Sequence, residues 1–255
     1  TVIFALLSLG LAYFGAAASG RVGFTSLDTT IISLASLAIY IVPLIALLLA
    51  YHTVVGEEEQ GTLLLLLSYP LGRGQLLAGK FLGHTGIICI SSVLGFGIAG
   101  IVMVLFSGET DPVELLGAYS YFIFSVMMLG LVFVAFAHLI SVLVAEKTRA
   151  AGLALLVWFL FVLVFDLALL GALVATQGQV GADIFPYLLL LNPTDVFRLV
   201  NLAGFEAVQV HAGLSAIATP GILSPGFLIG ILALWIAVPF SLAAWIFARL
   251  SLIHI

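Results

Sequence analysis

The sequence predicts an all-α membrane protein with six transmembrane helices. Of its 255 residues, 64% are hydrophobic and 7% are charged, and the mean hydropathy is +1.35. A soluble domain carries about 25% charged residues, so this composition cannot cover a surface that faces water. The chain also contains long unbroken apolar runs, and it lacks the short alternating segments that are typical of a transmembrane β-barrel.

Six apolar runs reach the roughly 20 residues that a bilayer-spanning helix needs. They lie at about 1–19, 29–55, 78–107, 115–145, 150–175 and 226–250. The first run looks shortened at its start, so we expect further residues before Thr1. Residues 1–255 are expected to form a single transmembrane domain, with a long segment at 176–225 between the fifth and sixth spans.

Lysine and arginine orient these spans, because basic residues concentrate in cytoplasmic loops. Five of the seven basic residues fall on the side that holds the second-to-third and fourth-to-fifth connections and the C-terminus; they are Arg73, Lys80, Lys147, Arg149 and Arg249. We therefore expect a multi-pass membrane protein, with both termini in the cytoplasm and segment 176–225 on the extracytoplasmic side.

The connection between the second and third spans reads EEEQGTLLLLLSYPLGRG over residues 57–74. Its three glutamates suit the start of a short helix, where negative charge complements the helix dipole. Leu63–Leu67 form an apolar run without a polar face, which we expect to lie in the membrane interface or against protein. Pro70 and the glycines beside Arg73 end the helix and turn the chain into the third span. Residues 56–74 are called the elbow below.

The order of residues in "EEEQGTLLLLLSYPLGRGQLLAGKFLG" resembles the signature of type-2 ATP-binding-cassette exporter permeases. In that family an acid-x-acid-Gln-Gly-Thr stretch leads to a leucine-rich helix, a Ser-x-Pro turn, an arginine and a downstream Gly-Lys. Leu64 and Gly72 depart from the pattern. The resemblance implies a coupling helix that docks on a cytoplasmic ATPase subunit. The residues it implies for coupling are Glu57, Glu58, Glu59, Gly61, Thr62, Pro70 and Arg73.

A narrower resemblance rests on "LAYFGAAASG", on "SLASLAIYIVPLIALLLAYHTVVGEEEQGTLLLLLSYPL" and on "LLLLNPTDVFRLVNLAGFE". These stretches are similar to the permease subunits of transporters for nitrous-oxide reductase maturation. The resemblance implies a homodimer in the bacterial inner membrane that serves copper-site maturation of a periplasmic enzyme of denitrification. It also implies two partners, a cytoplasmic ATP-binding-cassette ATPase and a periplasmic accessory protein of β-helical repeat type. Nucleic acid is not an expected partner, because there is no basic patch.

The chain is not expected to be an enzyme on its own. It contains no Gly-x-x-x-x-Gly-Lys-Ser/Thr phosphate loop, so ATP and magnesium would be bound by the partner ATPase. No cofactor is expected in this chain. No metal site is expected either, because copper transport would use clustered soft ligands and the sequence has one cysteine and three methionines.

Asp166 and His138 are the candidates for an intramembrane polar site. Asp166 lies near the middle of the fifth span, where a charged group costs a few kcal/mol and normally faces protein or a cavity. One interpretation is a proton, cation or substrate site. The other is an acid that clasps a neighbouring helix, and we favour it because no intramembrane lysine or arginine is available to pair with Asp166.

"LLLLNPTDVFRLVNLAGFE", residues 188–206, predicts the start of a helix in the extracytoplasmic segment. Asn192, Thr194 and Asp195 are capping candidates, and Pro193 favours the first turn. Two interpretations stay open, an interfacial helix on the outer leaflet and a docking platform for a periplasmic partner. In the second, Asn192, Asp195 and Arg198 would supply the polar contacts.

Other functions are also compatible with this sequence. The first is a type-2 exporter of a drug, a lipid or another hydrophobic substrate, which the elbow fits equally well. The second, from another class, is an ATPase-independent secondary transporter that uses Asp166. The third is a membrane anchor without a transport role. Whether a substrate crosses the membrane, or the chain acts as a mechanical relay, is open at this level.

Overall fold

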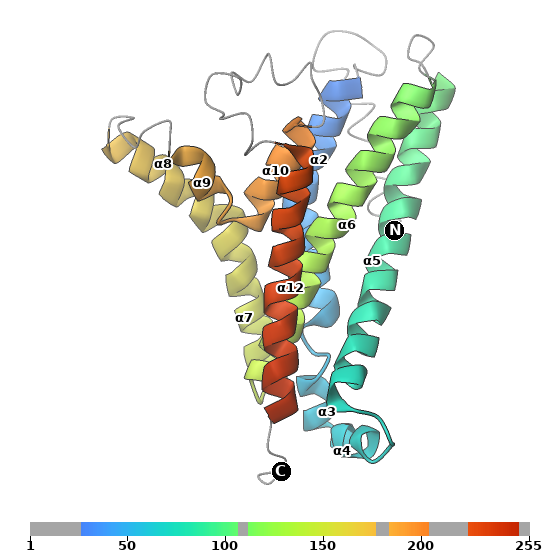
Figure 1. Cartoon of the computed structure of the whole chain (residues 1–255), viewed down its shortest axis with the longest axis vertical. Coiled ribbons are helices and arrows are strands. Elements are labelled where there is room, and N and C mark those ends of the chain that lie inside the picture. The colour runs from blue at the N-terminus through green and yellow to red at the C-terminus, as the bar shows by residue number, and fades with distance from the viewer. Residues whose placement is uncertain (1–26, 107–111, 177–183, 204–223, 250–255) are drawn as a thin grey trace.

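The computed structural model describes residues 27–106, 112–176, 184–203 and 224–249, which consist of helices and short connections (Figure 1). The described elements are α2 (Leu27–Ala50), α3 (Val55–Glu59), α4 (Thr62–Leu67), α5 (Arg73–Phe106), α6 (Pro112–Leu143), α7 (Lys147–Phe159), the π-helical turn η1 (Leu160–Val164), α8 (Phe165–Ala175), α9 (Phe185–Leu189), α10 (Pro193–Ala203) and α12 (Pro225–Arg249). Helices dominate because an apolar solvent offers the backbone no hydrogen bonds, so each segment satisfies its own.

Five stretches of the described residues are long and apolar enough to cross a membrane. They are Ile31–Glu59, Arg73–Ile101, Leu115–Leu143, Lys147–Ala175 and Pro225–Arg249. They coincide with the second to sixth predicted spans, so the all-helical class and these five elements are confirmed. The first predicted span, 1–19, and both chain ends lie outside the described residues. So do residues 177–183 and 204–223 of segment 176–225.

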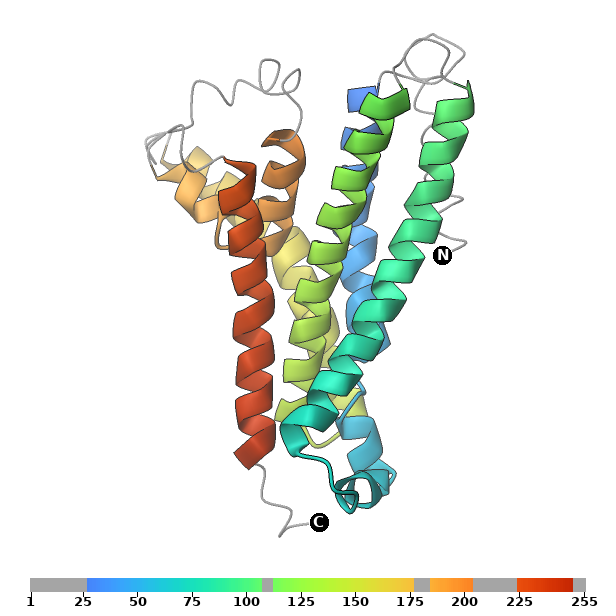
Figure 2. The ribbon, with the colours of Figure 1, turned by 45° about the vertical axis from the view of Figure 1, so that its right-hand side comes forward.

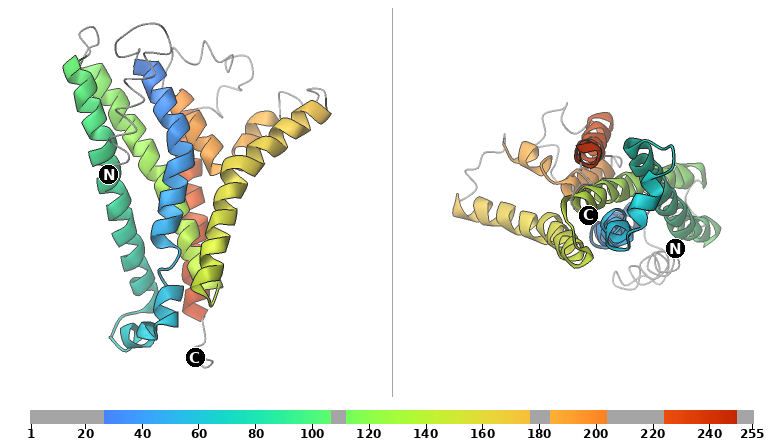
Figure 3. Two further views of the ribbon diagram at one scale, coloured as in Figure 1. Left: turned by 180° about the vertical axis from the view of Figure 1, so that it is seen from behind. Right: turned by 90° about the horizontal axis from the view of Figure 1, so that it is seen from below.

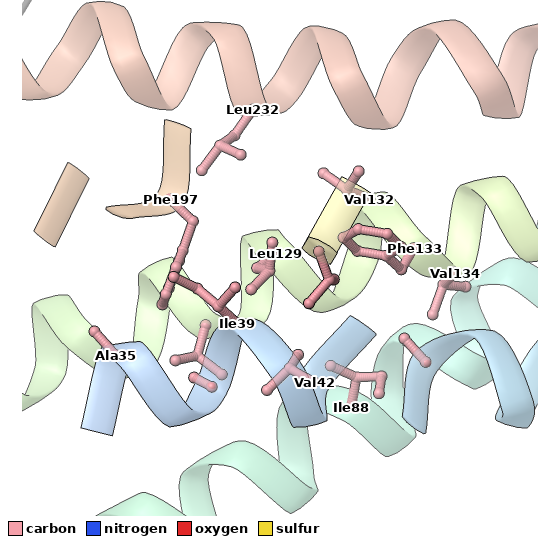
Figure 4. Close-up of a cluster of buried hydrophobic side chains, with 14 of the residues drawn as sticks. Ala35, Ile39, Val42, Ile88, Leu129, Val132, Phe133, Val134, Phe197 and Leu232 are labelled. Atoms are coloured by element: carbon pink, nitrogen blue, oxygen red, sulfur yellow. The ribbon is translucent and has the colours of Figure 1, made fainter. Parts of the chain in front are cut away.

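Helix α6 occupies the centre of the bundle. It packs against α12, α2 and α5, and it also contacts α7 and α10. From Phe122 to Ala137, eight of its hydrophobic side chains are fully buried: Phe122, Val126, Leu129, Val132, Phe133, Val134, Ala135 and Ala137. The close-up shows side chains of α2, α5, α10 and α12 gathered around Leu129 and Phe133 of α6 (Figure 4).

The two ends of the bundle differ in construction. The elbow helices α3 and α4 project at one end, which we call the elbow end (Figure 2). At the opposite end, called the far end, α8 leans away from the bundle while α9 and α10 return toward it (Figures 1 and 3). The fifth span is thus bent between α7 and α8, and none of the side chains of α8 is buried in the single chain.

The elbow contains two short helices, although its sequence predicted one. Gly61 separates α3 from α4 with a φ of 70°, in the left-handed region that residues with a Cβ rarely adopt. The glutamates therefore end one helix and the leucines form another, and the two turn relative to each other at this glycine. The prediction overlooked that glycine, two residues before the leucine run, could act as a breaker.

Close packing around α6 makes one glycine of this helix sensitive to substitution. A Cβ at Gly130 would lie 2.7 Å from Cγ2 of Ile88, whereas a Cβ at Gly117 on the same helix would have no atom within 4 Å. We expect Gly130→Ala to lower the melting temperature of the purified protein, since overpacking costs about 1–3 kcal/mol. Gly117→Ala is the matched control and should be neutral or stabilising. Equal melting temperatures for the two variants would contradict this packing.

Candidate functional site

The elbow is fixed to the bundle through its backbone. The hydroxyl oxygen of Ser141, on α6, accepts hydrogen bonds from the backbone N–H groups of Val54 at 2.8 Å and Val55 at 3.1 Å. These are donors at the start of α3 that have no partner within the helix. Ser141 is fully buried, so the first turn of the elbow is attached to the central helix.

Two glutamates of the elbow have partners within the protein. The Lys80 ammonium group pairs with Glu57 and also donates to the carbonyl oxygen of Thr53 at 2.7 Å. A carboxylate oxygen of Glu59 accepts from the backbone N–H of Lys147 at 2.6 Å, at the start of α7. These contacts join α3 to both α5 and the fifth span, in addition to its attachment to α6 through Ser141.

Arg73 connects the elbow to the last helix. Its guanidinium lies 3.5 Å and 3.4 Å from the carbonyl oxygens of Phe247 and Ala248, in the last turn of α12. A cation is favoured there, because the C-terminal carbonyl groups of a helix carry partial negative charge. Leu63 and Leu77 pack with Phe247 in a small apolar cluster of the same region. A movement of the elbow would therefore displace α12 as well.

Leu63 of α4 is 4% exposed and packs in the cluster with Phe247. Four other large side chains of the elbow are 46–65% exposed: Leu64, Leu65, Tyr69 and Leu71. We call these four residues the elbow patch. The hydrogen bonds and ion pairs described above fix the elbow to the bundle. An exposed apolar patch beside charged residues is typical of a surface that contacts another protein.

At the far end, the residues before α10 form a helix cap. The Asn192 side-chain oxygen accepts from the backbone N–H of Thr194 at 3.1 Å, and Pro193 begins the helix. Of the three capping candidates, Asn192 is therefore the one that caps the helix, and the prediction of Pro193 in the first turn is confirmed. The amide nitrogen of the same Asn192 donates to Asp195 at 2.9 Å and to the carbonyl oxygen of Phe161 at 2.9 Å.

Asp166 has a basic partner, contrary to our expectation from the sequence. Arg198 donates to Asp166 at 3.1 Å and to Asp195 at 2.5 Å, so it lies between the two carboxylates. We had found no lysine or arginine for Asp166, because Arg198 was assigned to an outer segment. The structure instead packs α10 beside the fifth span. In this geometry Asp166 clasps a neighbouring helix. Asp166, Asn192, Thr194, Asp195 and Arg198 are called the far-end cluster below.

Helix α10 lies within the bundle and does not lie along a membrane surface. Its apolar residues Val196, Phe197 and Val200 are fully buried, and it packs on α2, α6 and α12. The Tyr121 hydroxyl donates to the carbonyl oxygen of Val200 at 3.1 Å. The interpretation as an interfacial helix is therefore wrong. The neighbouring helices cover nearly all of α10.

This burial changes which polar residues of α10 an outside partner could reach. Asn192 and Asp195 are at most 1% exposed and are used in contacts within the chain. Only the Arg198 side chain, at 41%, remains accessible. A periplasmic partner that docks here would therefore meet Arg198 together with residues that the sequence did not single out.

His138 is buried among aromatic rings near the elbow end. One ring nitrogen, Nδ1, lies 2.8 Å from the carbonyl oxygen of Val134 on its own helix. Its ring meets those of Phe81 and His84 edge to face, at centroid separations of 5.5 and 5.2 Å. His138 and Asp166 lie in different regions, so they do not form one intramembrane site. Among the described residues there is no group of three or more histidine, cysteine or acidic side chains that could hold a metal ion.

Several residues of these sites were not identified from the sequence. Ser141 carries hydrogen bonds that join elements, and Lys80 was noted for its charge but not for its pairing with Glu57. A lysine so close to a span was one usable signal, because a charge at that depth needs a partner. For Ser141 we find no signal in the sequence.

Comparison with known proteins assigns the chain to a family. The model of the ABC-2 family transporter protein matches residues 1–252. A Pseudomonas aeruginosa protein named probable ABC transporter permease protein NosY is 52% identical over 249 residues, which cover 98% of this chain and 90% of the relative. A Stutzerimonas stutzeri protein with the same name is 50% identical over the same shares.

Asp195 makes the stability of the far end depend on pH. Burial raises the pKa of Asp195 from 3.8 to about 6; Arg198 opposes this rise and Asp166 adds to it. The folded protein then holds this proton more tightly than the unfolded chain does. The resulting stability is complete below pH 3.8 and is lost as the pH rises through about 6.

We therefore expect the melting temperature of the wild type to fall between pH 4 and pH 6 relative to that of Asp195→Asn. The difference should correspond to on the order of 2–3 kcal/mol. Paired thermal unfolding curves in one detergent would measure it, since all other titrating groups are common to both proteins. Parallel pH profiles would show that Asp195 does not titrate in this range.

Proposed function

Because the chain belongs to the ABC-2 family of transporters, we propose that it is the permease subunit on which a separate ATPase acts. The elbow patch carries this proposal. An exposed apolar surface at the end of a membrane bundle is unfavourable in water unless a partner covers it. In this proposal the ATPase covers the patch on the cytoplasmic side, and ATP with magnesium is bound there and not in this chain.

The hydrogen bonds and ion pairs that fix the elbow to the bundle support a mechanical role. Force applied at the patch would reach α6 through Ser141, α5 through Lys80, the fifth span through Glu59 and α12 through Arg73. Helix α12 in turn contacts the far end, where the Trp235 indole donates to the carbonyl oxygen of Leu190 at 3.1 Å. We propose that closure of the ATPase pair moves the elbow and that these contacts transmit the motion to the far end.

We further propose that this work serves maturation of the copper sites of nitrous-oxide reductase. Two things support it: the stretches quoted in the sequence analysis, and identity of 50–52% over 98% of the chain to the two proteins named NosY. The far end would then work on a periplasmic accessory protein of β-helical repeat type. The polar side chains of the described spans bond mainly within the protein, which favours a mechanical relay over a polar pathway for copper.

We also propose that two copies assemble. The fifth span exposes large apolar side chains along its length, among them Leu156, Leu167 and Val174 at 62–69%. A second copy would cover part of this surface, and each copy would present one elbow to one ATPase subunit. For the alternative of an ATPase-independent transporter, Asp166 would have to release Arg198 in every cycle, and no other observation favours that.

Co-purification from the native host tests this proposal. A tagged chain would be extracted in mild detergent, and the proteins that accompany it would be identified by mass spectrometry. We expect a cytoplasmic ATPase together with a periplasmic repeat protein. An ATPase without the periplasmic protein would support a general exporter instead. Recovery of the folded permease with neither partner would overturn the coupling role of the elbow.

Substitution within the elbow patch should weaken the ATPase contact. We expect Leu65→Gln to weaken ATPase binding by about tenfold, since loss of one well-buried apolar anchor costs more than 1 kcal/mol. Leu143→Gln is the matched control, because this leucine is also exposed, at 57%, but lies at the end of α6. Binding of the purified ATPase to permease in nanodiscs would be titrated for each variant. Equal affinities would show that the patch is not the docking surface.

A further inference from the structure

The fifth span contains a turn whose backbone hydrogen bonds are shifted by one residue. In an α-helix the N–H of Phe165 would bind the carbonyl oxygen of Phe161, but it binds the carbonyl oxygen of Leu160 instead. Phe161 therefore loses its regular donor. In an apolar region an unpaired carbonyl is unfavourable, so a π-turn at this depth requires a donor from another element.

The donors come from the residues that begin α10. The amide nitrogen of Asn192 lies 2.9 Å from the carbonyl oxygen of Phe161, and the Thr194 hydroxyl lies 3.1 Å from it. The Thr194 hydroxyl is also 2.8 Å from the Asn192 side-chain oxygen, and its single proton can be donated to only one of the two oxygens. The amide of Asn192 is therefore the donor that the Phe161 carbonyl keeps in either case. Both side chains are at most 1% exposed, which leaves water little access to replace them.

A second contact depends on the same register. Asp166 lies two residues after the π-turn, and it pairs with Arg198 of α10. If the turn relaxed to a regular α-helix, α8 would rotate by about 100°, the angle of one residue, and shift by about 1.5 Å. Asp166 would then leave Arg198, which would keep its bond to Asp195. The π-turn and the ion pair therefore stabilise each other.

The two sides of this turn differ in how firmly they are held. Helix α10 is fixed to the bundle, since the Asn201 amide donates to Ser125 on α6 at 3.1 Å and Trp235 donates to Leu190. Helix α8 has no buried side chain, and it leans away from the other helices (Figure 3). Among the described residues, little besides the contacts at the π-turn sets the direction of α8.

From these observations we infer that the π-turn is the hinge of the fifth span and that α10 is its latch. Asn192 and Thr194 hold the Phe161 carbonyl out of the helix ladder, and Arg198 holds Asp166. When α10 moves away from the π-turn, the backbone hydrogen bonds of the fifth span become regular and α8 rotates. Movement of the bundle reaches α8 through this change of register. The use of this movement in an ATP-driven cycle rests on the proposed function, whereas the latch itself does not.

Spin-label distances in the purified permease test the latch without any ATPase. Labels on Leu170→Cys of α8 and Leu234→Cys of α12 use two exposed positions, in a background that carries Cys89→Ala. We expect Asn192→Ala combined with Thr194→Val to shift the distance or to add a second population. Ser36→Ala is the control, because that hydroxyl bonds only a carbonyl group of its own helix, α2, and should change nothing.

A deletion separates the hinge from a general loss of packing. Removal of Val164 takes one residue out of the π-turn, so the ladder becomes regular while α8 keeps its facing. In that background the Asn192 and Thr194 substitutions should no longer change the distance. A shift in both backgrounds, or in neither, would overturn the inference. If the double variant fails to assemble, Thr194→Val alone keeps the volume and should still add a minor second population; its absence would also count against the latch.

The outcomes are independent of the proposed function. If the distances change as expected but the permease binds no ATPase, the hinge is supported and its role in an ATP-driven cycle is rejected. Conversely, ATPase binding with no change in the distances would keep the coupling role and remove the hinge.

Discussion

Every backbone polar group in the spans needs a partner within the protein, because lipid supplies none. Regular helices meet this requirement locally, and for this reason the described chain is built from them. The requirement becomes informative where the ladder is broken. At the start of the elbow, Ser141 takes up the free N–H groups of Val54 and Val55. At the bend of the fifth span, Asn192 takes up the carbonyl of Phe161. In both places a side chain from a distant helix joins two elements that hydropathy alone would leave independent.

The few charged residues follow the same constraint at higher cost. A charge away from water needs an opposite charge or several hydrogen bonds. Lys80 therefore binds both Glu57 and a carbonyl oxygen, and Arg198 lies between two carboxylates. In a chain with seven basic residues, these two take part in contacts between elements within the bundle. Charge in this protein thus serves largely to position the elbow at one end and α10 at the other.

The central helix α6 and the last helix α12 make these two ends parts of one body. Helix α6 contacts the elbow through Ser141 and α10 through Ser125, at points sixteen residues apart in the chain. Helix α12 meets Arg73 at one end and Leu190 near the other. Helix α8 stands outside this arrangement, since none of its side chains is buried. The packed helices and the unpacked α8 form the arrangement expected of a protein that transmits motion from one end of the bundle to the other.

The sequence by itself determined the class of protein, five candidate spans, the place of the elbow and the start of a helix near Asn192. These features depend on local properties: the length of an apolar run, the position of glycine and proline, and the residue types that cap a helix. Even the two helices of the elbow could have been predicted from Gly61. Only the tertiary structure decided that α10 is buried, that Asp166 pairs with a residue 32 positions away, and that the fifth span contains a π-turn. Hydropathy treats each helix separately, whereas these features arise because groups from different helices satisfy one another in a medium that cannot do so.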